Sequence, residues 1–411
     1  MNERIKFFFP DSQDMVDPNF NFDTEEMGFD RKRHRSDAYA HELFERPPYD
    51  GMLVSKAIVN SRYSLGQQQR LFRLGVRKFL RLNDNIPIIG DCGAFSYKDM
   101  KVPPYTVQEV VEFYHQCSFT YGISMDHVIL AYNEEWDDIK FTSPEIEDAR
   151  RRKELTLNMA VEFFKNSSGM LFTPMGAAQG WSPKSYADSV INLQKMGYNY
   201  IAMGGFVPLR TPEILKILET VDQIRKSTTK LHLLGVTRLD SISEFKRYGV
   251  ASFDSTSPFV QAFKSDKHNF HTPNHNYIAI RIPQVDANAK LKARILSGEV
   301  SQVDAINLER DCLTKMKAYA GGKISIDSTI NSLIAYTMLH DQQLFDKPDK
   351  IANREKEYRE TLQARPWEDD LCTICRTIGH HAIIFRGSER NRRRGFHNLD
   401  VFYRRLLATS L

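Results

Sequence analysis

The chain has 411 residues, with 56 lysines and arginines against 52 aspartates and glutamates, so its formal net charge is +4 when histidine is neutral. Apolar residues make up 41%, aromatic residues 11% and charged residues 26%, which excludes a disordered, collagen-like or coiled-coil chain. Because the net charge is small, any surface that binds nucleic acid would need local clusters of arginine and lysine.

The first 50 residues are polar and of mixed charge, with a basic run at 31–35, and they show no sustained periodicity. We therefore expect an irregular N-terminal extension over 1–50. The three phenylalanines at 7–9 are too few for a signal-peptide core or a membrane span, which predicts a cytoplasmic protein without a membrane segment. The five cysteines are too few and too scattered for a disulfide framework, so we expect reduced thiols.

From Gly51 onward, short apolar runs alternate with longer amphipathic segments. The apolar runs are predicted to be buried strands, and they read GMLVSKAIV, IPIIG, HVILAY, GMLFTPMGA, YIAMGG, KLHLLGV and VASFDS. The segments with helical period lie at 106–121, 143–166, 182–196, 211–226 and 240–248. Strands that alternate with helices pair in parallel, and this pattern predicts an α/β fold, a (β/α)8 TIM-like barrel whose main part is 51–284. No GxGxxG or GxxxxGK[ST] motif follows the first predicted strand.

The pattern changes after residue 284. Mostly helical stretches at 285–366 predict a helical region that completes or flanks the barrel. Residues 367–411 are rich in cysteine, histidine and arginine, and we expect a metal-binding subdomain there with a terminal helix.

Polar residues and glycines follow the predicted strands at the end where a barrel forms its active site. They are Asp91, Asn133, Gln179, Gly204, Gly205, Gly235 and Asp254. Each aspartate taken alone could cap a turn or a helix. Two carboxylates on one rim can also divide the roles of nucleophile and acid/base, as glycosyl transfer requires.

The segments GDCGAFSY, AQGW, AMGGF and LLGVTRLDSISEFKRYGVASFDSTSP, with a terminal Cys/His cluster, resemble the tRNA-guanine transglycosylase family in order and context. The resemblance runs from about residue 86 to residue 400. It implies that Asp254 is a nucleophile that attacks C1′ of a guanine nucleotide and holds a covalent glycosyl intermediate. It also implies that Asp91 is the acid/base residue that takes the proton from the incoming base.

The resemblance also implies a pocket for the base. Phe95 and Leu234 would lie on its two faces, although both residue types are more often core. Gln179 and the backbone of Gly205 would bind the base carbonyl. At the position where bacterial family members have an aspartate, the counterpart is Asn133, and Asp126 is a competing candidate.

Cys372 and Cys375, with His397 downstream, have the spacing of a structural zinc site, although two unrelated buried thiols are the alternative. The family pattern places its first ligand at Asp370, and His380 or His381 could instead supply the fourth bond. Five arginines cluster in the same segment: Arg386, Arg390, Arg392, Arg393 and Arg394. Guanidinium groups bind phosphate oxygens, so we expect a nucleic-acid-binding surface; a solvated charged face is the alternative.

The N-terminal 50 residues, the helical stretch and the IIFRGSERNRRRGFHN segment most resemble DpdA-type enzymes. This branch exchanges guanine in DNA for 7-cyano-7-deazaguanine (preQ0) within a DNA-modification (restriction-modification) system. The resemblance suggests a companion ATPase and downstream base-modifying enzymes as partners, and the target base must leave the duplex stack. The alternatives are a tRNA-guanine transglycosylase acting on an RNA loop, a non-catalytic nucleic-acid-binding subunit, and a metabolic barrel with a small-molecule substrate.

Overall fold

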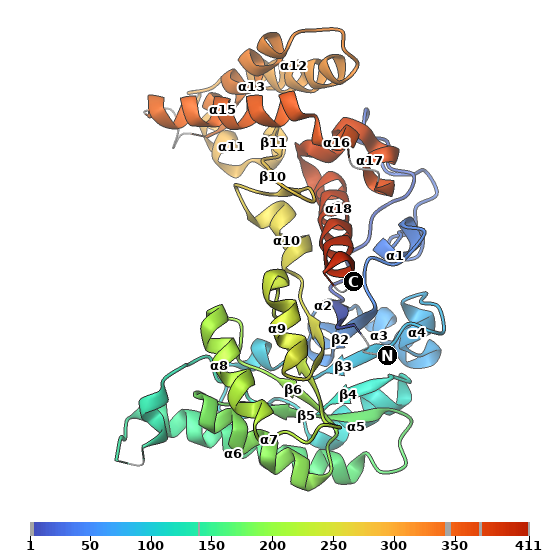
Figure 1. The fold of residues 1–411 in the computed structure, drawn as a ribbon. Helices are drawn as coiled ribbons and strands as arrows, with labels where there is room; N and C mark the ends of the chain where they lie inside the picture. Colours follow the sequence, from blue (N-terminus) through green and yellow to red (C-terminus); the bar gives the residue numbers. More distant parts are fainter. Residues whose placement is uncertain (1–3, 139, 342–346, 370–371, 410–411) are drawn as a thin grey trace. The chain divides into compact units, whose positions relative to one another are not determined.

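The computed structural model describes residues 4–138, 140–341, 347–369 and 372–409, which divide into two compact units. The first unit takes the chain up to Gln13, Tyr49–Thr256 and the segment from Arg405 onward. The second takes Asp14–Pro48 and Ser257–Arg404. Figure 1 labels the elements of both units.

The first unit is a closed barrel of eight parallel strands, which confirms the predicted TIM-like fold. The strands follow one another round the barrel in chain order. They are β1 (Lys6–Pro10), β2 (Gly51–Ser55), β3 (Ile88–Asp91), β4 (Tyr121–Ile123), β5 (Thr173–Ala178), β6 (Tyr200–Met203), β7 (Lys230–Leu233) and β8 (Val250–Asp254). All eight carboxyl ends therefore meet on one rim.

The expected irregular extension over 1–50 is wrong at its start, because β1 closes the barrel. Phe8 pairs with Gly51 of β2, and Phe7 pairs with Phe253 of β8. The three phenylalanines of β1 are at most 3% exposed. A strand buried on both faces is continuously apolar rather than alternating, and a five-residue run of this kind carries no periodic signal.

The predicted strand HVILAY is also wrong. The chain forms β4 earlier, at Tyr121–Ile123, and residues 124–133 belong to no helix or strand. Gly122 in β4 leaves room for the ring of Tyr114, which a Cβ at this position would approach to 2.4 Å. A three-residue strand with a central glycine has almost no local propensity, so packing rather than sequence pattern places it.

Helices connect the barrel strands. They are α2 (Lys56–Arg62), α3 (Leu65–Leu74), α4 (Val76–Phe79), α5 (Val107–Gln116), α6 (Pro144–Asn166), α7 (Pro183–Met196), α8 (Thr211–Asp222) and α9 (Ile242–Arg247). The hydroxyls of Ser143 and Ser182 accept hydrogen bonds from the backbone of α6 and α7, with Pro next in the chain as the first helical residue. Serine followed by proline thus starts both helices, because the hydroxyl satisfies a free N–H and proline needs none.

Side chains from successive strands fill the barrel interior. The buried inner cluster is Phe8, Leu53, Ile89, Ile123, Met175, Ala177 and Ala202, and Tyr121, Tyr200 and Leu234 pack against it. The interior is thus a packed core that fixes the strand ends in position.

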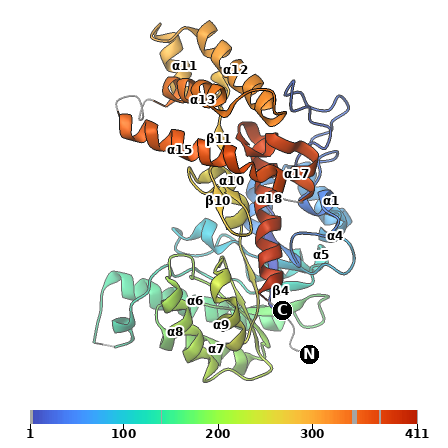
Figure 2. The same cartoon turned by 45° about the horizontal axis from the view of Figure 1, so that its top comes forward.

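The second unit is mostly helical. It contains α1 (Ala40–Leu43), α10 (Ser257–Lys264), α11 (Ala289–Leu296), α12 (Gln302–Ala320), α13 (Ile326–His340), α15 (Pro348–Ala364), α16 (Pro366–Asp369), α17 (Thr373–Ile378) and most of α18 (Gly387–Ala408). Short strands pair β9 (Phe270–His271) with β10 (Asn276–Tyr277) and β11 (Ile280–Arg281) with β12 (Ile384–Phe385). Helices α12, α13 and α15 pack against one another in sequence (Figures 1 and 2).

The structure divides the chain differently from the expected boundaries. The barrel strands end at Asp254, and the segment from Ser257 to residue 284 belongs to the second unit. Residues 285–366 do not complete the barrel, since β1 does so. No described helix combines the length and the apolar character needed to cross a membrane.

Candidate active site

The two aspartates singled out in the sequence are the last residues of barrel strands. Asp91 ends β3 and Asp254 ends β8, so both lie on the carboxyl-end rim. Burial raises the pKa of Asp91 to about 7, and the negative charges of Asp126 and Asp254 add to the rise. A carboxyl with this pKa can both give and take a proton near neutral pH.

Two groups contact the same carboxylate oxygen of Asp254. Its Oδ1 accepts from the backbone N–H of Gly235 at 3.1 Å and lies 3.3 Å from Nε2 of His232. Gly235 has φ +73°, so its backbone adopts the left-handed turn that aims this N–H. The side chain of Asp254 is 10% exposed, which leaves it open to the rim.

The structure places Asp126, not Asn133, beside the other rim groups. Asp126 is 2% exposed, and its Oδ2 accepts from the side-chain amide of Gln179 at 2.6 Å. The side chain of Asn133 instead accepts from the backbone N–H of Glu135. The expectation for Asn133 rested on HVILAY as a strand; because β4 ends at Ile123, the rim position falls on the residues just after it.

Gln179 follows β5 directly and is fixed at both ends of its amide. Its oxygen accepts from the backbone N–H of Ile129 at 3.1 Å, while its nitrogen donates to Asp126. Gly204 lies against this amide, where a Cβ would approach the amide nitrogen to 2.1 Å. Gly205 has φ +82° and would clash with the Ile129 carbonyl if it carried a side chain. The double glycine after β6 is thus required by close packing against Gln179.

Phe95 and Leu234, expected on the two faces of a base, both follow barrel strands. Phe95 lies in the 3₁₀ turn Ala94–Tyr97 after β3 and is 59% exposed, so its ring is accessible from solvent. Leu234 follows β7 and packs partly against the barrel interior.

Sequence reasoning missed three residues that hold the rim carboxylates. The Sγ of Cys92 lies 3.2 Å from Oδ1 of Asp126, and the hydroxyl of Tyr97 donates to the backbone carbonyl of Asp126. Burial raises the pKa of the Cys92 thiol, so Cys92 is a neutral donor here. The third is His232. Of these three residues, only Cys92 could have been found from the sequence, because it directly follows the predicted active-site residue Asp91.

Four of the five clustered arginines are internal, which corrects the expectation that they form a phosphate-binding surface. Arg386, Arg390, Arg393 and Arg394 are at most 5% exposed. Their partners lie within the second unit: Glu25 and Glu309 for Arg386, Glu25 for Arg390, Glu389 and the Asp17 carbonyl for Arg393, and the Ala262 and Ile384 carbonyls for Arg394. The fifth, Arg392, is only partly buried, and it donates to the Met15 carbonyl. Buried charge is tolerated only when it is paired in this way.

Glu25 is the central partner of these arginines. Its burial opposes ionisation, but hydrogen bonds and charge from Arg386, with the charge of Arg390, outweigh this and lower its pKa to about 2. Ion pairs of Glu25 therefore attach the segment 14–48 to Arg386, just before α18, and to Arg390 within α18. The paired residues are more than 360 positions apart in the sequence.

The buried group Cys372, Cys375 and His397 can hold a metal ion, because its three ligand atoms lie within 4.8 Å of one another. Hydrogen bonding with Cys375, and then with His397, lowers the pKa of the Cys372 thiol to about 5. His397 directs Nε2 to the carbonyl of His271 at 2.7 Å, which leaves Nδ1 on the sulfur side. The hydrogen bond to the His271 carbonyl fixes the orientation of the imidazole ring, as is usual for histidines that bind metals.

The fourth ligand was expected at Asp370, which lies outside the described residues. Among the described residues, neither alternative joins the group. His381 stacks on Phe22 with 5.1 Å between ring centroids, and His380 lies against His381.

Replacing Glu25 with Gln should leave two buried guanidinium groups short of charge compensation. We expect a loss of about 3 kcal/mol in the free energy of unfolding, measured by urea denaturation at pH 7. Because the pKa of Glu25 is depressed, its stabilisation is present above the ordinary glutamate value of 4.5, and the difference from wild type should shrink as pH falls towards 2. The matched control is Glu26→Gln on the exposed neighbour; an equal, small loss in both variants would contradict this role.

A comparison with known proteins agrees with this geometry. A DNA-guanine transglycosylase from Salmonella montevideo is 46% identical over 413 residues, which cover 99% of this chain and 97% of that protein. No family model matches the chain. Identity at this level over the whole length establishes common fold and family. The chain therefore belongs to the DNA-guanine transglycosylases, within the tRNA-guanine transglycosylase superfamily.

Proposed function

We propose that this protein exchanges guanine in DNA for preQ0 through a glycosyl intermediate on Asp254. The observation that carries the proposal is the trio of carboxylates on one rim, in which Asp126 and Asp254 help to raise the pKa of Asp91 to about 7. The named relative supports DNA as the substrate. A DNA-modification system, with a companion ATPase and enzymes that process the inserted base, fits the same family resemblance.

The reaction divides into two displacements at C1′ of the target nucleotide. An oxygen of Asp254 bonds to C1′ as the C1′–N9 bond to guanine breaks, and protonated Asp91 gives its proton to the leaving base. The N9 of preQ0 then bonds to C1′ and releases Asp254, while the Asp91 carboxylate takes the N9 proton. The proton on Asp91 is restored, and two inversions give overall retention.

The remaining rim residues suit recognition of the flipped base. The amide of Gln179 and the carboxylate of Asp126 offer a donor and acceptors side by side, and the exposed ring of Phe95 can stack on a base. Because a rim pocket cannot reach a base inside a duplex, the nucleotide must be presented out of the stack. The four buried arginines do not contribute to this binding, so more exposed cations, with the partly buried Arg392 among them, must contact the DNA backbone.

The substrate is tested by release of labelled guanine. Purified protein and preQ0 are incubated with matched guanine-labelled DNA and tRNA, and the product nucleoside is identified by mass. We expect release and preQ0 incorporation with DNA. Release from tRNA alone would favour the RNA alternative, and release from neither would favour a non-catalytic binding subunit.

Replacing Asp254 with Asn should remove the nucleophile at nearly constant shape. We expect base exchange to fall by about 10³-fold or more, with no covalent protein–DNA species. The control is Asp99→Asn, an exposed aspartate whose side chain is 86% accessible and pairs with Lys98. Turnover near the wild-type rate in D254N would refute the assignment.

The raised pKa of Asp91 predicts opposite pH dependences for the two half-reactions. Guanine release needs protonated Asp91 and should slow as pH rises through about 7, whereas attack by preQ0 needs the carboxylate and should slow as pH falls through the same value. Single-turnover measurements of each step from pH 5.5 to 8.5 check this. Both inflections should vanish in Asp91→Asn; an inflection that persists there would assign it to another group.

We further infer that the metal held by Cys372, Cys375 and His397 is a structural zinc ion, since two thiols and an imidazole are typical zinc ligands. Replacing Cys375 with Ser should lower bound zinc, measured by mass spectrometry of the purified protein, and lower the melting temperature. The control is Cys312→Ser, a buried thiol of α12 that contacts the Ser332 carbonyl. Equal zinc in both variants would remove the assignment.

A further inference from the structure

A one-residue bulge lies between the last two barrel strands, next to Asp254. Leu231 pairs with Val250, but the next residue, His232, pairs with Ser252, so Ala251 is the extra residue. A bulge re-aims side chains, and here it brings His232 opposite Ser252. Asp254 lies two positions beyond Ser252 and therefore on the same face of β8. The register thus places His232 and Ser252 directly below the carboxylate.

A chain of hydrogen bonds connects this carboxylate to the other end of the barrel. The Tyr200 hydroxyl contacts Oγ of Ser252, and Oγ of Ser252 contacts Nδ1 of His232. Nε2 of His232 lies 3.3 Å from Oδ1 of Asp254. His232 and Ser252 have no exposed surface, so water does not compete for these bonds.

The chemistry of the four side chains determines which group donates and which accepts in each hydrogen bond. An ionised carboxylate only accepts, so Nε2 of His232 must carry a proton. In a neutral imidazole, Nδ1 then accepts from the Ser252 hydroxyl, and the Ser252 oxygen accepts from the Tyr200 hydroxyl. Each donor of this hydrogen-bonded series meets one acceptor, so the polar side-chain atoms of His232 and Ser252 are all paired.

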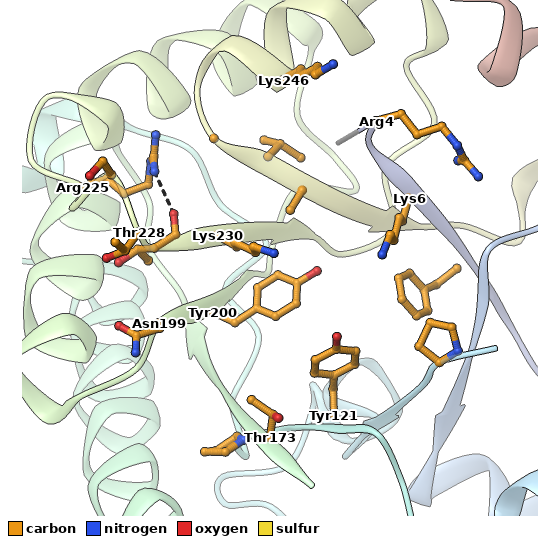
Figure 3. Close-up of a pocket in the computed structure, with 18 of the residues that line it drawn as sticks. Arg4, Lys6, Tyr121, Thr173, Asn199, Tyr200, Arg225, Thr228, Lys230 and Lys246 are labelled. Atoms are coloured by element: carbon orange, nitrogen blue, oxygen red, sulfur yellow. Dashed lines mark hydrogen bonds between the residues drawn. The ribbon is translucent and has the colours of Figure 1, made fainter. Parts of the chain in front are cut away.

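Packing holds both ends of this chain in place. The ring of Phe8 meets His232 edge-on with centroids 5.9 Å apart. Tyr200 packs edge-on against Tyr121 at 5.6 Å, in a cavity at the amino ends of the strands. Figure 3 shows the hydroxyls of Tyr121 and Tyr200 and the side chains of Lys6 and Lys230 directed towards the middle of this cavity. The chain therefore runs through the barrel interior from this cavity to the rim.

We propose that His232, oriented by Ser252 and Tyr200, is the positioning residue for the nucleophile and selects Oδ2 of Asp254 as the attacking oxygen. Both Gly235 N–H and His232 Nε2–H address Oδ1, and Oδ2 has no hydrogen-bond partner among the described residues. This inference rests on the proposed function, because it assigns a role in the Asp254 step.

The assignment accounts for both halves of the exchange. Oδ2 bonds to C1′ as the C1′–N9 bond breaks, and Oδ1 becomes the carbonyl oxygen of the ester while it still accepts from Gly235 and His232. When the N9 of preQ0 displaces the ester, the electron pair of the C1′–Oδ2 bond returns to the carboxylate. The two donors stabilise that returning charge on Oδ1. They therefore assist the departure of the Asp254 carboxylate from C1′ as well as its orientation for the first attack.

Variants of His232 can separate the effect of its hydrogen bond to Asp254 from the effect of its packing in the barrel. His232→Phe removes the donor but fills the site, and we expect kcat for exchange to fall about 10²-fold with KM for DNA and preQ0 unchanged within twofold. His232→Gln can present an N–H at the Nε2 position and should recover most of the loss. Ser252→Ala and Tyr200→Phe should each lower kcat about threefold to tenfold, because they free the imidazole to turn. Tyr121→Phe, in the same cavity but outside the chain, is the matched control.

A second measurement does not depend on activity. The ¹⁵N chemical shifts of the imidazole, assigned by their loss in His232→Gln, should report a neutral ring protonated at Nε2. An Nδ1–H tautomer would overturn the proposal, as would His232→Gln being as slow as His232→Phe, or an unchanged kcat in His232→Phe. If the wild-type protein fails to exchange the base, the proposed function fails, while the tautomer still tests the positioning of Asp254.

Discussion

Three carboxylates, Asp91, Asp126 and Asp254, share one rim of the barrel, and the chemistry of the site follows from their burial and from the charges that Asp126 and Asp254 place near Asp91. Burial raises the pKa of Asp91 to about 7, with a further contribution from the negative charges of Asp126 and Asp254, and burial also raises the pKa of Asp126. Asp126 is supported by Gln179, Cys92 and Tyr97, whereas Asp254 has the Gly235 N–H and His232. Different hydrogen-bond donors thus give chemically similar groups different roles.

The interior of the barrel holds Asp254 in position. The bulge at Ala251 and the chain through Ser252 to Tyr200 connect the nucleophile to the packed interior, which is rigid because its side chains interlock. In the second unit, Glu25 and its arginines play the corresponding structural role, since they bind the segment 14–48 to the α18 region. Arginines that resemble a phosphate site in sequence are here the internal ion pairs of a fold.

Much of the architecture was predictable from local signals. Parallel barrel topology followed from alternating apolar and amphipathic segments, and the Ser-Pro starts of α6 and α7 followed from capping chemistry. The missed elements, β1 and β4, are short strands held by long-range pairing, for which local propensity carries little information. The strand misplaced at HVILAY explains why Asn133 was favoured over Asp126.

Part of the active site was also predictable from local sequence signals. Asp91 and Asp254 end apolar strands that the sequence marks, and Gln179 directly follows another such strand, so the structure places all three on the rim. The burial of Arg394 and its neighbours was not predictable, because their partners come from distant segments, such as Glu25 and the Ala262 carbonyl. His232 reads as one residue of an apolar strand, and only the bulge reveals its contact with Asp254.

Peptide mapping of the covalent species shows whether Asp254 carries the sugar during exchange. Protein is incubated with guanine-containing DNA without an incoming base, quenched in denaturant, digested with nuclease and trypsin, and analysed by mass spectrometry. We expect a sugar adduct on the peptide Tyr248–Lys264, at Asp254, that disappears when preQ0 is added before the quench. An adduct on Asp91 or Asp126, or release of guanine without any covalent species, would contradict it.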